Sequence, residues 1–524
     1  MEKAENGGRF PAMRPEGRSA AKGGMPVILS FERVLGELLI ARRGFHGDSA
    51  RGRVVNDSRK VLPGDIFVAI PGTVSDGHNY IDAAIKARAQ VVIHQHPLSH
   101  YAPHTTYLMV TSTRLAYARC CREFNGCPDR ELPLFGVTGT NGKTTTVYMI
   151  EHLLRAGGRS CGLISTVETR DGKIVRPADC TTPEAGVLFP LLAEMRRNRL
   201  AAAAMELSSH ALDQGRVAGT VFRVAVFTNL SGDHLDYHRD MEHYYHAKKR
   251  LFTEQLSPKG AAVINVDDRY GRRLADELAD TTRVITFGSA DAEAKWRITN
   301  VELPEDGVRF RLEGRDEAFD VGSNLIGSHN IHNLTGAILA VREFGLTPEE
   351  INRALAVKIR VPGRLERINS RKGYAVYVDY AHTDDALSNV LEILRKITPR
   401  RLIAVFGAGG DRDHLKRPRM GLAAAEKADL VILTSDNPRS EEPEAIIREI
   451  AAGIPEGAAY EIEPDRFLAI RRALELAEPG DAVLIAGKGH ETYQEIKGVR
   501  HPFDDRKVVK TVLSSLGERG EPQP

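Results

Sequence analysis

Long apolar runs, a charge of one sign and a cysteine framework are all missing from this 524-residue chain. No stretch of about 18 apolar residues occurs, so the sequence offers no helix able to span a bilayer. Lysine and arginine number 72 against 70 aspartate and glutamate residues. This balance gives no electrostatic reason to expect nucleic acid or an anionic membrane as a partner, and we expect neither.

Cysteine is scarce, and none of the cysteines forms a CxxC pair, so neither a zinc site nor a set of disulfides is indicated. The five are Cys120, Cys121, Cys127, Cys161 and Cys180. We expect reduced thiols in a cytoplasmic protein. The first 25 residues lack the apolar core of a secretory signal. We expect residues 1–24 to be a disordered extension, or the translation start to lie at Met25; acidic residues in this stretch argue against a transit peptide.

Short apolar runs alternate with helical patterns along most of the chain. The runs are rich in β-branched residues and end in polar or glycine-containing loops; they are QVVIH, LFGVTG, AAAAMEL, VAVFTNL, GAAVINV, LIAVFGAGG, LVILTSDN and AVLIAGKG. This alternation is typical of α/β folds with mainly parallel sheets. Ligands of such folds gather at the carboxyl ends of the strands, where the polar motifs of this chain also lie.

A chain of this length is too long for one hydrophobic core and suggests two to four domains. Two loop-like segments divide it, NGCPDRELP near residue 130 and RVPGRLER near residue 361. We predict three domains, at residues 25–130, 131–360 and 361–524.

The segment FGVTGTNGKTTT follows one apolar run and opens an amphipathic helical pattern. A strand, a glycine loop and a helix N-terminus together make a phosphate-binding site, because backbone N–H groups and the helix dipole face the anion. Lys143 would reach the β- and γ-phosphates, and the Thr144 hydroxyl would meet Mg²⁺. The strict pattern, however, requires glycine at position 137, where this chain has valine; the loop glycine is Gly139.

The displaced glycine makes GTNGKTTT similar to the ATP loop of the Mur ligase family and of the related folylpolyglutamate synthases. Eight further motifs follow in the family's order and at family-like spacings: MELSSHALDQGR, FTNLSGDHLDYH, GSHNIHN, PGRLER, DYAHT, GGDRD, DNPR and GKGHE. The resemblance covers nearly everything from residue 54 onward. It implies an N-terminal UDP-binding α/β domain, a central P-loop-type ATPase domain with a mainly parallel sheet, and a C-terminal Rossmann-like domain.

The resemblance also implies the reaction. ATP phosphorylates a carboxylate to an acyl phosphate, an amine attacks it, and an amide forms, with two Mg²⁺ ions assisting. The nearest subgroup adds meso-2,6-diaminopimelate to UDP-N-acetylmuramoyl-L-alanyl-D-glutamate in peptidoglycan precursor synthesis. We therefore expect a cytoplasmic, monomeric enzyme of cell-wall biogenesis, with these two small molecules and ATP as substrates.

The resemblance assigns the ATP contacts to Gly139, Thr140, Asn141, Gly142, Lys143, Thr144, Thr145, Asn330, Asn333, Arg364, Asp379 and His382. It assigns catalysis to Lys143, Glu206, His210 and Lys248, and metal binding to Thr144, Glu206, His210 and, as a carbamate, Lys248. By themselves, a glutamate and a histidine four apart are common on helices. Lys248 stands beside Lys249 and Arg250, so the residues alone favour a solvated lysine there.

The resemblance assigns the acceptor, a uridine-diphosphate muramoyl dipeptide, to two groups of residues. They are Asn56, Ser58, Thr73, Val74, Ser75, Thr181, Thr182, Ser208, Gln214 and Arg216. The chain departs from the commoner family residues at Cys180, Gly232 and Asp384, and Cys180 puts one polar contact with the acceptor in question.

The third domain decides which amine is added. Diaminopimelate carries a carboxylate that lysine lacks, so a site that selects it needs a cation at that end. Arg439 of DNPR and Arg412 of GGDRD supply cations, and Glu491 of GKGHE can receive an ammonium group. The resemblance assigns the amine to Arg412, Asp436, Asn437, Pro438, Arg439, Gly487 and Glu491.

Three alternatives remain open at this point. An L-lysine-adding member of the same family is the nearest, although such members generally lack the arginine of DNPR. A folylpolyglutamate synthase would not need the N-terminal motifs NDSR and GTVSDGH. A nucleotide-dependent regulatory protein or a motor NTPase would not need the motifs that recognise a carboxylate and an amine.

Overall fold

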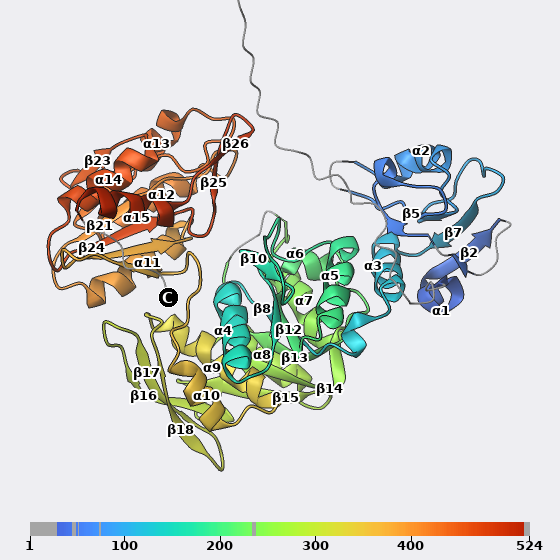
Figure 1. The fold of residues 1–524 in the computed structure, drawn as a ribbon, viewed down its shortest axis with the longest axis horizontal. Helices are drawn as coiled ribbons and strands as arrows, with labels where there is room; N and C mark the ends of the chain where they lie inside the picture. Colours follow the sequence, from blue (N-terminus) through green and yellow to red (C-terminus); the bar gives the residue numbers. More distant parts are fainter. Residues whose placement is uncertain (1–28, 45–48, 51, 73–74, 233–236, 518–524) are drawn as a thin grey trace, which may run out of the picture. The chain divides into compact units, whose positions relative to one another are not determined.

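The computed structural model describes residues 29–44, 49–50, 52–72, 75–232 and 237–517 (Figure 1). The chain falls into two compact units, Met1–Gly126 and Cys127–Pro524. The expected extension, residues 1–24, and the expected acceptor contacts Thr73 and Val74 lie outside the described residues. Within these ranges no helix combines the length and the apolarity that crossing a bilayer requires.

The first unit is built on a five-stranded sheet in the order β2-β7-β6-β5-β4. Its elements are β1 (Leu29–Ser30), α1 (Phe31–Leu35), β2 (Leu39–Arg43), β3 (Ser49–Ala50), β4 (Val54–Val55), β5 (Ile66–Val68), α2 (Ile81–Lys86), β6 (Val91–His94), β7 (Thr106–Val110) and α3 (Thr113–Phe124). Strands β4 to β7 are parallel, and β2 runs antiparallel to β7. Phe67 and Val92 are fully buried, as expected for parallel strands covered on both faces.

The second unit begins with an eleven-stranded sheet in the order β11-β10-β9-β12-β8-β13-β14-β15-β16-β17-β18. Its strands are β8 (Leu134–Thr138), β9 (Cys161–Ile164), β10 (Glu168–Arg170), β11 (Val175–Pro177), β12 (Ala202–Glu206), β13 (Phe222–Phe227), β14 (Leu256–Asn265), β15 (Arg283–Gly288), β16 (Trp296–Glu302), β17 (Val308–Glu313) and β18 (Ala318–Ser323). In this sheet order, the seven neighbouring strands β9, β12, β8, β13, β14, β15 and β16 are parallel. Strands β10 and β11 at one edge, and β17 and β18 at the other, add antiparallel pairs.

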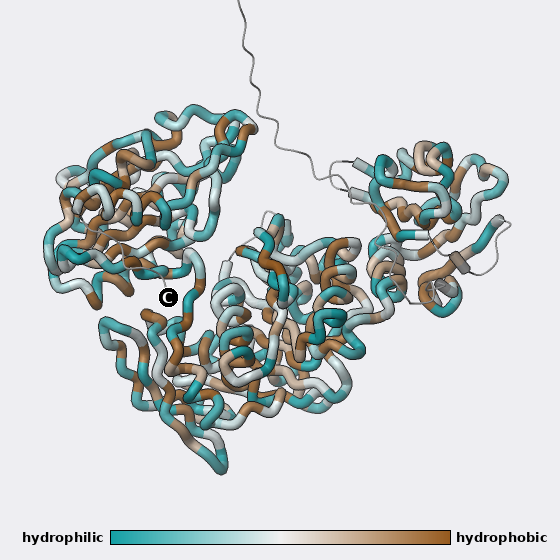
Figure 2. The backbone as a smooth tube through the Cα atoms, in the orientation of Figure 1, coloured by the Kyte–Doolittle hydropathy of each residue, from teal (hydrophilic) through white to brown (hydrophobic). Residues whose placement is uncertain are grey.

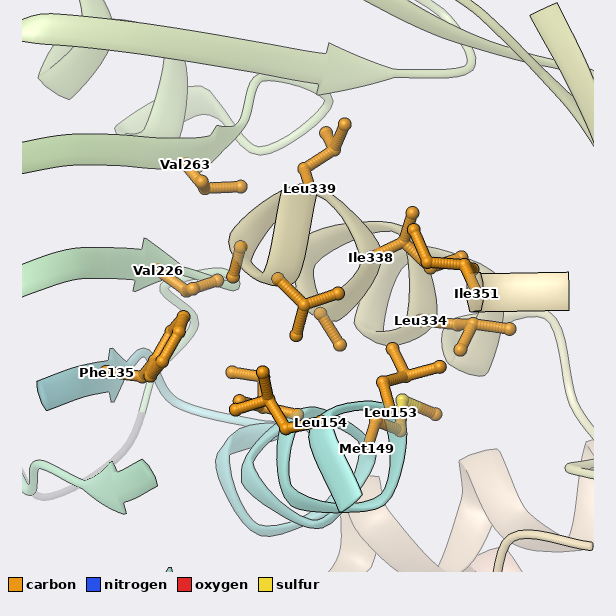
Figure 3. Close-up of a cluster of buried hydrophobic side chains, with 14 of the residues drawn as sticks. Phe135, Met149, Leu153, Leu154, Val226, Val263, Leu334, Ile338, Leu339 and Ile351 are labelled. Atoms are coloured by element: carbon orange, nitrogen blue, oxygen red, sulfur yellow. The ribbon is translucent and has the colours of Figure 1, made fainter. Parts of the chain in front are cut away.

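The helices of this part pack on the sheet and on each other. They are α4 (Lys143–Ala156), α5 (Ala185–Arg197), α6 (Ser209–Asp213), α7 (Met241–Thr253), α8 (Arg269–Leu278), α9 (His329–Glu343) and α10 (Pro348–Leu355). Figure 3 shows Leu153 and Leu154 of α4 facing Leu334 and Ile338 of α9, with Phe135 of β8 beside them. All five side chains are fully buried, and each contributes about 1.5–3 kcal/mol by leaving water. The glycine loop between β8 and α4 therefore starts from a rigid base.

The last part of the second unit is a six-stranded sheet in the order β19-β20-β24-β21-β22-β23, in which only β19 is antiparallel. Its strands are β19 (Glu366–Asn369), β20 (Ala375–Asp379), β21 (Leu402–Phe406), β22 (Leu430–Leu433), β23 (Tyr460–Ile462) and β24 (Ala482–Ala486), with a separate hairpin β25 (Tyr493–Ile496) and β26 (Val499–Pro502). Its helices are α11 (Asp384–Ile397), α12 (Lys416–Ala425), α13 (Pro443–Ala451), α14 (Arg466–Leu476) and α15 (Asp505–Ser515).

Each of the eight apolar runs singled out in the sequence contains a strand, and the strand residues of these runs are almost all buried. In Figure 2 the hydrophobic colour gathers inside each part of the chain, whereas the outer loops are mainly hydrophilic. The α/β class with mainly parallel sheets is confirmed. The three large sheets each lie inside one predicted domain, but the two compact units separate only at residue 126, so the remaining boundaries stay predictions.

Candidate active site

The loop between β8 and α4 contains two glycines in backbone conformations that other residues avoid. The φ angles are +148° at Gly139 and +85° at Gly142. A Cβ added to Gly139 would lie 1.9 Å from Oγ1 of Thr228, and one added to Gly142 would lie 2.1 Å from Oδ1 of Asn333. Both positions therefore require glycine, for conformation and for space.

The end of the neighbouring strand β13 holds this loop in place. The backbone N–H groups of Thr140 and Asn141 donate to the carbonyl and side-chain oxygens of Asn229, each at 2.9 Å. Oγ1 of Thr228 donates to the carbonyl oxygen of Asn141 at 2.6 Å. The loop is thus shaped before any ligand binds, which lowers the cost of binding a phosphate.

Two lysines converge on the carbonyl groups of the same loop. Nζ of Lys143 donates to the carbonyl oxygens of Gly139 (3.0 Å) and Thr140 (2.7 Å), and Nζ of Lys248 donates to that of Gly139 at 2.7 Å. Lys248 is only 1% exposed, with Nζ 4.5 Å from the ring centre of Tyr244. The reading of Lys248 as a solvated surface lysine is therefore wrong. Two ammonium groups beside one loop favour an anion there.

Glu206, the last residue of β12, is fully buried next to the loop helix. Its Oε1 accepts from the backbone N–H of Thr166 at 2.9 Å, and its Oε2 accepts from the hydroxyls of Thr144 (3.1 Å) and Thr166 (3.2 Å). Burial raises the pKa of the Glu206 carboxyl, and the positive charges of Lys143 and Arg364 act in the opposite direction. A cation at this carboxylate would offset its burial.

These oxygens fit Mg²⁺, which takes oxygen ligands and usually combines one or two carboxylates with water and substrate phosphates. Oγ1 of Thr144 and Oε2 of Glu206 form such a pair, 3.1 Å apart. Among the described residues no three His, Cys, Asp or Glu side chains gather as a metal site. The ring of His210, on α6, lies 4.1 Å from that of Tyr237. Metal binding by His210 and by Lys248 stays a prediction.

The expected adenine-side and hinge residues are anchored within the protein. Nδ2 of Asn333 donates to Oδ1 of Asn330 at 3.1 Å, and both side chains are buried on α9. Nη2 of Arg364 donates to Oγ1 of Thr144 at 3.3 Å, so the hinge arginine reaches the loop helix. Both carboxylate oxygens of Asp379 accept backbone N–H groups at 2.7 Å, which gives it a clear role in shaping the hinge.

His382 is the remaining hinge residue. Its Nδ1 lies 2.8 Å from the carbonyl oxygen of Tyr380, and its ring lies 4.6 Å from the Tyr380 ring. The guanidinium of Arg364 lies 4.9 Å from that same ring. The His382 side chain is exposed to solvent. An aromatic surface flanked by a cation suits a nucleotide, although contact with ATP stays a prediction.

The expected muramoyl-dipeptide residues of the second unit lie together. Nη1 of Arg216 donates to the carbonyl oxygen of Thr182 at 2.9 Å, and Nε donates to Oε1 of Gln214 at 3.1 Å. Oγ1 of Thr182 accepts from the backbone N–H of Ser208 at 3.0 Å. The hydroxyl oxygens of Thr181 and Thr166 lie 3.1 Å apart, which connects this group to Glu206. The exposed Cys180 precedes the threonine pair.

The first unit brings its own candidates to the carboxyl ends of neighbouring parallel strands. Asn56 and Ser58 follow β4, and Ser75 follows β5. Oδ1 of Asn56 accepts from the Tyr117 hydroxyl at 3.3 Å, and the Ser75 hydroxyl donates to that of Tyr80 at 2.9 Å. This edge is where ligands of parallel sheets bind, so the position agrees with the expected role.

The predicted amine site lies on three loops that follow β21, β22 and β24. Nδ2 of Asn437 donates to Oε2 of Glu491 at 2.8 Å. Nη1 of Arg439 donates to the carbonyl oxygen of Gly410, two residues before Arg412. The structure thus brings residues more than 50 positions apart into one polar cluster at the carboxyl edge of the sheet.

Close backbone approach explains the other residues of this cluster. A Cβ added to Gly487 would lie 2.5 Å from Oδ2 of Asp436, and one added to Gly410 would lie 2.0 Å from the carbonyl oxygen of Pro438. Arg439 itself has a φ angle of +51°, and its backbone is held between the carbonyl oxygen of Glu495 and the N–H of Lys497 on the hairpin. The loops are packed too closely for larger residues at either glycine.

Sequence reasoning did not assign roles to Thr166, Asn229 or Lys488, although all three contact predicted site residues. Asn229 and Lys488 lie inside the motifs FTNLSGDHLDYH and GKGHE, so their place in the sequence could have predicted a role at the site. Thr166 has only its place shortly after an apolar strand to mark it.

Comparisons with known proteins agree with this geometry in each part of the chain. The description "Mur ligase family, catalytic domain" matches residues 53–125, "Mur ligase middle domain" matches residues 137–341, and "Mur ligase, glutamate ligase domain" matches residues 363–489.

Curated relatives match over most of their length. The UDP-N-acetylmuramoyl-L-alanyl-D-glutamate--2,6-diaminopimelate ligase of Solibacter usitatus (strain Ellin6076) is 45% identical over 463 residues, covering 88% of this chain and 93% of the relative. The protein of the same name from Aquifex aeolicus (strain VF5) is 44% identical over 461 residues, covering 88% and 93%.

Solved structures agree as well. A structure described as that of a UDP-N-acetylmuramoyl-L-alanyl-D-glutamate--2,6-diaminopimelate ligase is 33% identical with a TM-score of 0.68, covering 94% of this chain and 99% of the other. A Mycobacterium tuberculosis folylpolyglutamate synthase complexed with ADP, at 21% identity and a TM-score of 0.59 over 78% and 95%, shares the fold. The three-domain α/β architecture is thereby confirmed. Family models in all three parts and relatives that match nearly end to end lead to one conclusion: the chain belongs to the Mur ligase family.

Proposed function

We propose that this ligase uses ATP to add meso-2,6-diaminopimelate to UDP-N-acetylmuramoyl-L-alanyl-D-glutamate. The γ-carboxylate of the D-glutamate becomes an acyl phosphate, and the amine displaces phosphate, so that the products are the tripeptide, ADP and phosphate. The observation that carries the proposal is the cluster of Arg439, Asn437 and Glu491 at one sheet edge, in a chain 45% identical to a ligase named for this amine.

The loop between β8 and α4 would hold the ATP phosphates through backbone N–H groups. Lys143 would turn from the loop carbonyls to the β- and γ-phosphates, a short move for a flexible side chain. Thr144 and Glu206 would hold Mg²⁺, which supplies charge neutralisation when bound. Arg364, already in contact with Thr144, would bring further positive charge to the transferred phosphoryl group.

A second ion would need Lys248 as a carbamate, together with His210. The buried Nζ of Lys248, in contact with the Gly139 carbonyl, puts this side chain at the phosphate loop. A carbamate would convert a cation into an oxygen ligand there. We also propose that the protein is cytoplasmic and acts as a monomer.

In the third domain, Arg439 and Arg412 would receive the distal carboxylate of diaminopimelate, because a guanidinium binds a carboxylate through two parallel hydrogen bonds. Glu491 would receive an ammonium group. L-Lysine lacks the distal carboxylate and would leave the arginines without a partner, which disfavours it.

The test is phosphate release with Mg-ATP and the muramoyl dipeptide, in the presence of meso-diaminopimelate, L-lysine or no amine. We expect release and a tripeptide product only with diaminopimelate. Arg439→Asn tests the selectivity, because asparagine accepts a positive φ angle and the change removes the guanidinium. We expect kcat/KM for diaminopimelate to fall about 100-fold, and that for lysine to change less than about threefold.

The exposed Arg448→Asn on α13 is the matched control and should behave like the wild type. Turnover of lysine by the wild type would keep the ligase reaction and overturn the selectivity. A wild type that releases no phosphate with any of the amines would overturn the proposed function.

A further inference from the structure

Lys488 lies at the centre of the amine cluster, and its side chain is fully buried. Its Nζ donates to Oδ1 of Asn437 at 2.9 Å, to Oε2 of Glu491 at 3.2 Å and to Oδ1 of Asp436 at 3.4 Å. An ammonium group has three protons to donate, and here three oxygens receive them. All three acceptors belong to residues that the proposed function assigns to the amine substrate.

This arrangement solves an electrostatic problem of the site. Asp436 and Glu491 bring two carboxylates into a partly water-free cluster, and burial together with the charge of Asp436 raises the pKa of Glu491. Lys488 opposes both effects. Without a resident cation, one carboxylate would take up a proton and lose its ability to receive an ammonium group.

Lys488 also links two of the three loops. Asp436 and Asn437 follow β22, whereas Lys488 and Glu491 follow β24. The hairpin completes the surroundings of the first loop, since Nε2 of Gln494 donates to the Asp436 carbonyl oxygen at 2.8 Å. The orientation of the Glu491 carboxylate thus depends on Lys488 and on Asn437, which donates to the same Oε2.

We propose that Lys488 is the positioning residue of the amine site: it holds Asp436, Asn437 and Glu491 as a preformed, ionised acceptor set for the ammonium group of the incoming amino acid. This inference rests on the proposed function. It adds a residue that acts through others and leaves the chemistry at the acyl phosphate unchanged.

The first test is Lys488→Met, which keeps the length of the side chain and removes the charge. We expect the KM for meso-diaminopimelate to rise about 100-fold, because the buried carboxylate of Asp436 and the partly buried one of Glu491 lose their compensating cation. The KM values for ATP and for the muramoyl dipeptide should change less than about threefold. Lys510→Met, exposed on α15, is the matched control and should match the wild type.

The pH profile separates positioning from a general loss of structure. With Lys488 gone, the acid limb of kcat/KM for diaminopimelate should move to higher pH, because the cation that opposes protonation of Glu491 is removed. The other charged or titratable groups that act on Glu491 or respond to its charge are Asp436, Tyr380, Tyr493 and Arg466, and all remain in the variant.

Lys488→Met combined with Glu491→Gln covers the case in which the single variant does not fold, because the pair removes one charge of each sign. We expect its KM for diaminopimelate to exceed that of Glu491→Gln alone by about tenfold or less, well under the effect of about 100-fold in the wild type, because only Asp436 then loses its compensating cation. The role of Lys488 would be overturned by any of three results. These are a KM increase from Lys488→Met that is as large in the Glu491→Gln background as in the wild type, an acid limb that does not shift, and equal KM increases for all three substrates. A wild type inactive with diaminopimelate would instead overturn the proposed function, and the wild-type arm shows this directly.

Discussion

The carboxylate of Glu206 is completely buried, yet its hydrogen-bond donors, Thr144 and Thr166, are neutral. The positive charges of Lys143 and Arg364 act on it as well and lower its pKa, but burial has the larger effect. A carboxylate that is buried before its cation binds lowers the stability of the folded protein, because its negative charge has lost its hydration. Removing the charge of this one residue should therefore change the stability of the protein measurably.

Glu206→Gln keeps the shape of the side chain and removes its charge. The raised pKa means that folded protein binds the proton more tightly than unfolded protein, so stability falls as pH rises from 4.5 through the raised pKa. Above both values the charged carboxylate costs stability, and glutamine avoids this cost. At about pH 8 we expect a Tm equal to or above that of the wild type, and kcat lower by at least about 100-fold.

Thermal melts as a function of pH, with and without Mg²⁺, check this expectation. The difference between the variant and the wild type should close as pH falls toward 4.5, and Mg²⁺ should raise the Tm of the wild type alone. A variant that melts lower than the wild type at about pH 8 would show that the charge stabilises the fold, contrary to our assignment.

The loop between β8 and α4 works as an element because its shape is fixed by glycine. Gly142 and Gly158 flank α4 with similar φ angles, +85° and +79°. A Cβ at Gly142 would meet Oδ1 of Asn333 at 2.1 Å, whereas one at Gly158 would meet nothing within 4 Å. The two positions therefore separate backbone strain from loss of the loop.

We expect Gly142→Ala to weaken ADP binding by more than about 100-fold, because the loop must move away from α9 and lose its alignment with the helix N-terminus. Gly158→Ala carries the same left-handed strain of about 1 kcal/mol and should bind ADP like the wild type. Titration calorimetry measures both. Equal loss in the two variants would mean that strain alone, rather than the shape of the loop, accounts for the effect.

At the scale of elements, the sequence predicts buried strands well because continuous β-branched runs have few other uses. LFGVTG and AVLIAGKG became β8 and β24 as expected. The edge strands β16 to β18, which pair with one another in antiparallel fashion, were not predicted, because half-exposed strands such as Trp296–Glu302 mix polar and apolar residues. Contacts between distant segments were equally hidden: nothing in the spacing of Thr166 and Glu206 announces that one donates to the other.

The departures from commoner family residues are tolerated where the structure describes them. Asp384 stands in the first turn of α11, where a negative charge is favourable, and pairs with Arg419 at 2.9 Å. No atom of the described residues lies within 4 Å of a Cβ placed at Gly232, so none of these residues demands glycine there. Local chemistry explains Asp384, and the structure offers no reason for Gly232.

At the scale of the whole molecule, the proposed substrate contacts are distributed over the two compact units, and those of the acceptor occur in both. The unit Met1–Gly126 has its own sheet and its own buried cluster around Phe67 and Val92, and it contains Asn56, Ser58 and Ser75, which we propose to contact the acceptor. The unit Cys127–Pro524 carries the phosphate loop, Glu206 and the amine cluster. A core of its own is what allows a segment to fold alone.

We expect the fragment 127–524 to fold and to bind ADP with a Kd within about threefold of that of the full chain, because every contact of the phosphate loop described above comes from this unit. It should nevertheless form no tripeptide, because the predicted uridine-diphosphate contacts of the first unit are missing. Calorimetry and the ligase assay measure the two properties, and the same fragment with Gly142→Ala is the control that should bind no ADP.

Tripeptide formation by the fragment at wild-type KM for the acceptor would show that the first unit does not bind this substrate. A fragment that folds but fails to bind ADP would show that the phosphate loop depends on the first unit for its shape.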